Sequence, residues 1–274
     1  MAKYGPAWAS RVPAALALVS AMAVMTAACA GGAGPGTAAS PKATPSKPVI
    51  KVEPATARSL HAGYGIRQQI QYAKVTGLPD QAVAAKVNER LRRAPEQVLD
   101  SWQDDITDGR DAGTGATPAT TTLRAKAAIG LAGPRVVSVN HTFETDGADL
   151  GRQPAVTQLP LVLDLTTGRE LATRDLLSEK ARTPEGARAL ERVIARHGPG
   201  GRLCDQAPPG TRGLRPDDIV SDDPREDVVI AFPDRNGVRF MIGLWKLGYP
   251  MSCLAQPITV PYADLKGLLA GPLA

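Results

Sequence analysis

The three cysteines are the residues of this chain whose chemistry depends most on their surroundings. Cys29 follows small residues at the end of an apolar N-terminal stretch, whereas Cys204 and Cys253 lie in the C-terminal third of the chain. A cysteine can carry a lipid, close a disulfide, bind a metal or act as a nucleophile, and its compartment favours some of these roles over others. The segment that precedes Cys29 therefore decides how all three cysteines are interpreted.

Residues 1–28 have the layout of a secretory signal peptide. Lys3 and Arg11 give this segment its positive charge, and residues 12–25 form an apolar stretch. A membrane-spanning helix needs about 20 apolar residues, so the stretch is too short to be one. We therefore expect the protein to be exported.

The sequence TAAC at residues 26–29 resembles a bacterial lipobox. In a lipobox the cysteine receives a diacylglyceryl group and becomes the first residue of the mature protein, which predicts lipidation of Cys29. The alternative is cleavage at an ordinary A-x-A site formed by residues 28–30, which would remove this cysteine. Residues 30–48 are small, polar and rich in proline, a composition typical of a flexible tether with a reach of about 25 Å.

These features divide the chain into a signal peptide of residues 1–28, a lipid-anchored tether of residues 29–48 and a single domain of residues 49–274. The domain keeps only Cys204 and Cys253, and an even pair outside the cytoplasm is most simply a disulfide. Closing a loop of about 50 residues would stabilise the fold by about 4 kcal/mol in the chain-entropy model. Neither cysteine has a CxxC partner or a histidine close in sequence, so we expect no metal site and no cofactor.

No group of residues in the domain forms a recognisable active site. The G-x-S-x-G motif of serine hydrolases and the glycine signatures of phosphate-binding loops are both missing from the sequence. His141 and Glu144, together with Asp146 and Asp149, could imitate a metal cluster, but on a strand the first two point to opposite faces. We therefore predict that the protein is not an enzyme.

Composition argues against nucleic-acid binding. The formal net charge is only +5, the basic residues are interleaved with acidic ones, and aromatic residues make up 4% of the chain. A nucleic-acid interface needs a clustered basic surface, and a single-strand interface also needs aromatic platforms. We therefore expect partners of other kinds.

Hydrophobic periodicity predicts an α+β fold, with a mainly antiparallel sheet packed against a long N-terminal helix and one or two shorter helices. The long helix is expected over residues 79–102, with a kink or break at Pro95, and is followed by a polar loop over residues 104–122. A second helix is expected over residues 183–198. The expected extended or strand segments are residues 61–78, 123–131, 135–147, 158–177, 227–233 and 237–248, and residues 257–269 should form a short strand and a terminal helix.

Several sequence blocks occur in the order found in the extracellular domain of RsiV, an anti-sigma factor that is a lysozyme receptor, and in related secreted bacterial proteins. The blocks are residues 70–91, 136–151, 159–177 and 258–269. The third block is similar to the family's strand, turn and "L-x-D-L" continuation through Asp164, Leu165, Thr167, Gly168, Arg169, Leu171, Asp175 and Leu176. The resemblance to this RsiV-like family covers most of residues 60–270 and implies a single α+β domain that binds a partner rather than an enzyme.

Lysozyme becomes a candidate ligand through this resemblance, and the predicted location makes peptidoglycan another. Animal-type lysozymes are strongly basic, so a complementary surface would have to be acidic. The candidate acidic patch consists of Asp217, Asp218, Asp222 and Asp223. A histidine that often follows Gly-Ala in the family is Asp149 here, so no role of that histidine is transferred.

Together these patterns predict a bacterial cell-surface lipoprotein, held at the outer face of the cell membrane by lipid, with a non-catalytic binding domain. One alternative is a secreted cell-wall glycan hydrolase, for which the acidic groups at residues 216–218 and 221–227 could supply paired carboxylates. Another alternative is a structural envelope protein without a ligand.

Overall fold

The computed structural model describes residues 48–59, 65–111, 121–146, 158–205, 207–220, 228–250, 252–253, 257–271 and 273. All of them belong to one compact unit, Thr44–Ala274. Cys29, Asp149, Asp222 and Asp223 lie outside the described residues, as do the predicted signal peptide and nearly all of the predicted tether. Within the described part of the chain, no helix has the length and apolar character needed to cross a membrane.

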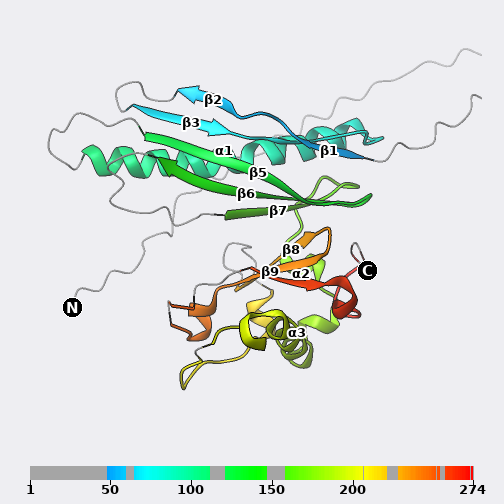
Figure 1. Ribbon diagram of the computed structural model, residues 1–274. Coiled ribbons are helices and arrows are strands. Elements are labelled where there is room, and N and C mark those ends of the chain that lie inside the picture. The colour runs from blue at the N-terminus through cyan, green and yellow to red at the C-terminus, as the bar shows by residue number, and fades with distance from the viewer. Residues whose placement is uncertain are drawn as a thin grey trace, which may run out of the picture. The chain divides into compact units, whose positions relative to one another are not determined.

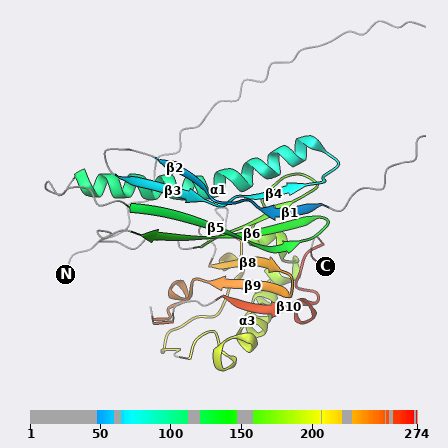
Figure 2. The ribbon, with the colours of Figure 1, turned by 45° about the horizontal axis from the view of Figure 1, so that its top comes forward.

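The fold is α+β, as predicted, and its strands form three sheets (Figures 1 and 2). The largest sheet has the order β2-β3-β5-β6-β7, a second has the order β10-β9-β8, and β1 pairs with β4. All pairs are antiparallel except β3 with β5, which are parallel. The strands are β1 (Val49–Val52), β2 (Thr56–Ser59), β3 (Ile66–Ile70), β4 (Ala73–Thr76), β5 (Thr121–Ala132), β6 (Val136–Asp146), β7 (Gln158–Asp164), β8 (Val229–Asp234), β9 (Gly237–Ile242) and β10 (Ile258–Pro261).

The long helix α1 (Gln81–Asp111) extends further than the sequence pattern predicts. It continues through Pro95 without a break, and the predicted loop after residue 102 begins as helix. Its second half is held by Trp102, which is buried, and by Ile106, which packs against the same apolar cluster. Tertiary packing therefore overrides both the helix-breaking tendency of proline and the polar composition of the last turns.

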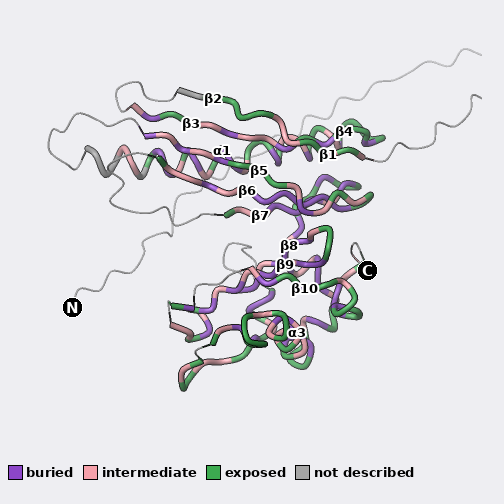
Figure 3. The backbone as a smooth tube through the Cα atoms, in the orientation of Figure 1, coloured by how far each residue is buried: buried purple, intermediate pink, exposed green. Residues whose placement is uncertain are grey.

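Helix α1 covers one face of the large sheet with a stripe of apolar side chains, as the period of three to four residues predicts. Towards its N-terminus, Val83, Val87 and Leu91 belong to a cluster that includes residues of β4, β6 and β7. Towards its C-terminus, Leu99 and Trp102 belong to a second cluster with residues of β3, β5 and β6. Figure 3 shows the buried residues along these strands.

The three-stranded sheet approaches the opposite face of the large sheet at Gly130 and Ser138. The Ser138 hydroxyl donates to the main-chain oxygen of Pro233 at 2.5 Å and accepts from the main-chain nitrogen of Leu131 at 2.7 Å. A Cβ atom at Gly130 would lie 2.6 Å from the Pro233 oxygen, so only glycine allows this approach. The contact places the end of β8 directly against β5 and β6 of the larger sheet.

The remaining elements agree with the sequence pattern in part. The helix predicted over residues 183–198 is α3 (Pro184–His197), and it is capped by Thr183, whose hydroxyl accepts from the main-chain nitrogen of Gly186. The strands predicted over residues 227–233 and 237–248 form a hairpin of β8 and β9, with Arg235 and Asn236 in its turn. The return segment after β7 is only a single bridge, followed by the short helix α2 (Thr173–Leu176). The predicted terminal helix is one turn, η6 (Tyr262–Leu265).

Candidate functional site

The sequence block of residues 159–177 builds a turn after β7. The Asp164 carboxylate accepts hydrogen bonds from the main-chain nitrogens of Thr166 and Thr167 and from the Thr166 hydroxyl. Partial burial raises the pKa of Asp164, but these hydrogen bonds outweigh it and the pKa is lowered. Arg169 pairs with Asp175 at 3.0 Å. These polar groups are engaged with one another, so the block fixes the local fold and offers little for catalysis.

A tryptophan that the motif search did not single out is exposed on the C-terminal half of the domain. Trp245 belongs to the short 3-10 turn η5 (Leu244–Leu247), and 62% of its surface is accessible. Its neighbours Leu244 and Leu247 are buried, so the turn is anchored on both sides while the indole points outward. The sequence pattern predicts a strand here, and the signal for the turn was Gly248, which has a φ of +88°.

Two residues of the predicted acidic patch lie in the described part of the chain, on the 3-10 turn η4 (Pro216–Asp218). Asp217 is exposed. Asp218 is buried, and its carboxylate accepts two hydrogen bonds from the Arg212 guanidinium, at 2.5 and 2.7 Å, and one from the main-chain nitrogen of Arg215. Burial raises the pKa of Asp218, but the hydrogen bonds from Arg212 and Arg215 and the positive charges of both side chains together outweigh it, so the pKa is lowered. Asp218 therefore has an internal partner, while Asp217 faces solvent.

Arg212 and Val228 connect η4 to η5. The main-chain nitrogen of Arg212 donates to the oxygen of Leu247 at 3.0 Å. Val228 donates to the oxygen of Asp218 and accepts from the nitrogen of Gly243. Arg212 and Val228 are therefore each hydrogen-bonded both to η4 and to η5 or the residue that precedes it, which brings the described part of the predicted patch close to the turn that carries Trp245.

The predicted disulfide between Cys204 and Cys253 is present, with 5.7 Å between the two Cα atoms. Cys204 follows the segment after α3, and Cys253 follows η5. The disulfide therefore joins the segment that follows η5, the turn that carries Trp245, to the segment that follows α3. It restricts how far this turn can move from the core.

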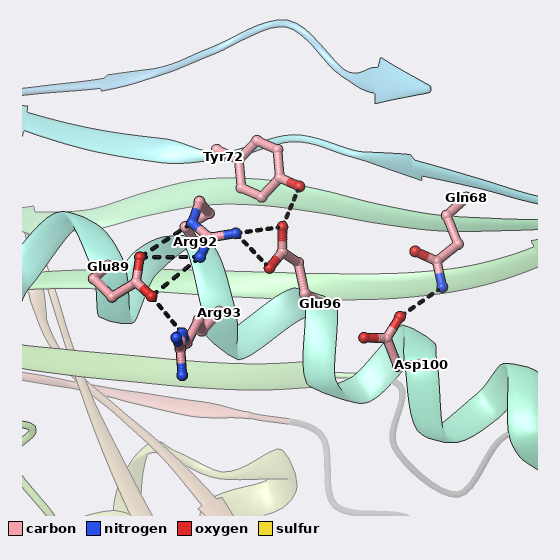
Figure 4. Close-up of polar contacts among 7 residues, drawn as sticks. All are labelled: Gln68, Tyr72, Glu89, Arg92, Arg93, Glu96 and Asp100. Atoms are coloured by element: carbon pink, nitrogen blue, oxygen red, sulfur yellow. Dashed lines mark hydrogen bonds and ion pairs between the residues drawn. The ribbon is translucent and has the colours of Figure 1, made fainter. Parts of the chain in front are cut away.

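A second polar cluster lies on α1 (Figure 4). The Tyr72 hydroxyl and the Arg92 guanidinium both donate to the buried carboxylate of Glu96, at 2.9 and 2.8 Å. Arg92 also donates to Glu89, which accepts from Arg93 as well. Hydrogen bonds from Arg92 and Arg93 hold the pKa of Glu89 below its usual range. The ion pairs all lie within α1, and the hydrogen bond from Tyr72 to Glu96 joins them to the segment after β3.

A groove of about 600 Å³ lies beside this cluster, between α1 and the turn after β7. Helix α1 contributes most of its lining, and the rest comes from β7 and the turn. The lining residues are Lys86, Glu89, Arg90, Arg93, Ala94, Gln97, Leu161, Gly168 and Glu170. Sequence reasoning missed this groove because its two sides are far apart in the chain, although the spacing of Lys86, Arg90 and Arg93 places the three cations on one helix face.

The sequence argument about His141 is supported by its position in β6. His141 is fully buried on the α1 side of the sheet, whereas Glu144 points to the other face and pairs with Lys126 at 2.8 Å. Within the described residues, no group of three or more histidine, cysteine, aspartate or glutamate side chains is arranged to hold a metal ion.

Solved structures of two bacterial proteins are similar to this chain. One is a DUF3298 family protein from Pseudomonas aeruginosa, with a TM-score of 0.45 and 11% identity over 84% of this chain and 97% of that one. The other is a member of the DUF3298 family from Bacteroides fragilis, with a TM-score of 0.46 and 11% identity over 82% of this chain and 94% of that one. No family model and no curated protein match the chain. The function therefore has to be argued from the residues themselves.

Proposed function

We propose that the protein is a bacterial cell-surface lipoprotein whose domain binds an extracytoplasmic ligand without catalysing a reaction. The lipid anchor is Cys29, and the binding surface is centred on Trp245. The ligand is a protein such as lysozyme or a cell-wall polymer such as peptidoglycan. The sequence of the N-terminal segment supports the anchor, and the geometry around η5 supports the binding surface.

The exposure of Trp245 is the observation that carries the proposal. Large aromatic side chains are usually covered in folded proteins, and tryptophan is enriched among the residues that dominate binding energy at interfaces. The buried neighbours Leu244 and Leu247 fix the turn. Arg212 also donates hydrogen bonds to the main-chain oxygens of Lys246 and Leu247 in η5. A rigidly mounted aromatic side chain loses little conformational entropy when it binds.

The buried carboxylates favour binding over hydrolysis. A glycosidase needs two carboxylates that face each other across a cleft, about 5–9.5 Å apart. In the described part of the chain, the buried carboxylates are Glu96 and Asp218, and each one is paired with an arginine. Both buried carboxylates therefore stabilise the fold through their arginine partners. This pairing makes them poor candidates for the acid and base of a hydrolase.

Calorimetric titration of the full chain, purified in detergent, with lysozyme and with peptidoglycan fragments tests the proposal. We expect saturable binding of one of the two and no cleavage of the fragments. Replacing Asp217 with Asn should weaken lysozyme binding if that protein is the ligand, and Arg188→Gln on α3 serves as a control for a surface charge change. Cleavage of the fragments would establish a hydrolase instead, and an absence of binding to either ligand would favour a structural protein.

A further inference from the structure

We propose that the groove between α1 and the turn after β7 binds a linear polyanion, with the anionic groups placed along Lys86, Arg90 and Arg93. The ligand is a polymer that carries one phosphate or carboxylate group in each repeat unit. The groove is distinct from the Trp245 surface and does not depend on the function proposed for it.

The three cations form a row along the helix. Positions 86, 90 and 93 are separated by four and three residues, so their side chains lie on one face of α1. With a rise of 1.5 Å per residue, the row is about 10 Å long. Like charges at this spacing repel one another by a few tenths of a kcal/mol for each pair, and an anion lying along the row would relieve that repulsion.

Each cation retains donors that can reach a ligand. Lys86 is exposed and has no ion-pair partner among the described residues. Arg90 lies 3.7 Å from the Glu170 carboxylate, which is too long for a hydrogen bond, and both side chains are largely exposed, so the pair is weak. Arg93 binds Glu89 through its Nε atom, and within the described part of the chain its Nη atoms have no hydrogen-bond partner.

Part of the lining of the groove is apolar. Ala94 and the buried Leu161 provide its apolar surface. Gly168 has a φ of +72°, and a Cβ atom there would lie 2.9 Å from Cβ of Lys86, so glycine keeps the turn close to the helix. A concave site of this kind accepts one polymer strand more readily than the flat surface of a membrane.

The acidic residues of the groove do not cancel its preference for anions. Glu89 is held by Arg92 and Arg93, and its pKa is lowered by those hydrogen bonds, so it stays ionised and fixes the two guanidinium groups. The Glu170 carboxylate lies 3.7 Å from Arg90. An incoming phosphate can therefore replace Glu170 as the partner of Arg90 with a shorter, charge-assisted hydrogen bond.

Helix α3 provides a matched control. Arg188, Arg192 and Arg196 are exposed at intervals of four residues, and they form a row of three cations that does not line the groove. Removing either row changes the net charge of the protein by the same amount. A ligand that responds only to overall charge would be affected equally by both changes.

The test measures binding of the full chain in detergent to a glycerol-phosphate oligomer and to an oligogalacturonate at low salt. We expect one of these polymers to bind. The variant Lys86→Gln/Arg90→Gln/Arg93→Gln should weaken that binding roughly tenfold or more, with a flatter dependence on salt. The variant Arg188→Gln/Arg192→Gln/Arg196→Gln should change it less than about twofold. The polymer that binds identifies the anion as phosphate or carboxylate.

Three results would overturn the proposal: equal weakening in both triple variants, no binding to either oligomer, or binding only to vesicles of anionic phospholipid. Circular dichroism establishes that each variant is folded. If the groove variant is not folded, the single substitutions Lys86→Gln and Arg93→Gln replace it, and unchanged affinity in both would equally refute the proposal.

Discussion

The side chain of Asn88 on α1 makes two hydrogen bonds to the main chain of Val75 on β4. Its Oδ1 atom accepts from the Val75 nitrogen at 2.8 Å, and its Nδ2 atom donates to the Val75 oxygen at 2.9 Å. The amide therefore takes the place of a neighbouring strand and joins the long helix to the two-stranded sheet.

Replacing Asn88 with Leu should lower the free energy of unfolding by about 1–3 kcal/mol, because the Val75 nitrogen and oxygen lose their partner in a largely buried place. Urea denaturation followed by circular dichroism measures the change. Gln97→Leu, at an exposed position of the same helix, is the control and should have little effect. Equal stabilities of the two variants would contradict the assigned role of Asn88.

Burial lowers the pKa of His141 to about 4, against the opposing influence of the main chain of Leu159. Below a pH of about 6.5 the unfolded chain binds a proton at this residue that the folded protein does not bind, so stability falls as the pH decreases towards 4. The loss is about 3 kcal/mol between these limits.

His141→Leu should remove most of this pH dependence. Unfolding in urea at pH 7 and at pH 4.5 provides the comparison. If the variant loses as much stability as the wild type on acidification, other groups are responsible for the effect.

Arg212→Met should destabilise the domain by about 3 kcal/mol at pH 7, because it leaves the buried carboxylate of Asp218 without its cation. The lowered pKa of Asp218 contributes stability above its unfolded pKa, and this contribution is lost as the pH falls through the folded value. The difference between variant and wild type should therefore shrink at acidic pH. Arg188→Met is the control, and a constant difference at all pH values would argue against this explanation.

The sequence predicted the elements whose hydrophobic period is long enough to be distinctive. Alternation over residues 123–131 and 135–147 identified β5 and β6, and the periodicity of residues 183–198 identified α3. Strands β1 and β2 were missed, because each has four residues and the two lie on either side of Pro54. Such short strands are defined by their pairing with β4 and β3, which local patterns do not contain.

The candidate sites were less predictable than the fold. Trp245 is exposed because Gly243 and Gly248 end the strand pattern and allow a 3-10 turn, whereas simple alternation continues β9. The groove needs the turn at Gly168 to lie against Lys86, a contact between residues distant in sequence. The disulfide was predictable, because the export expected from the N-terminal segment would leave Cys204 and Cys253 with no simpler use.

Replacing Cys29 with Ala should release the protein from the membrane fraction, because the lipid is the proposed anchor. Fractionation of cells that express the wild type or the variant, with detection of the chain in membranes and medium, measures this. Metabolic labelling with a radioactive fatty acid should mark only the wild type. Retention of the variant in membranes would contradict the anchor.

Fluorescence of Trp245 tests the central claim most directly. The mature chain is expected to hold two tryptophans, of which Trp102 is buried and Trp245 is 62% exposed. We predict that saturating lysozyme or peptidoglycan fragments protect the exposed indole from quenching by acrylamide. In Trp245→Ala this change should disappear, and the affinity should fall about 30-fold or more. Unchanged quenching of Trp245 in the presence of a bound ligand, or full affinity in Trp245→Ala, would contradict the account.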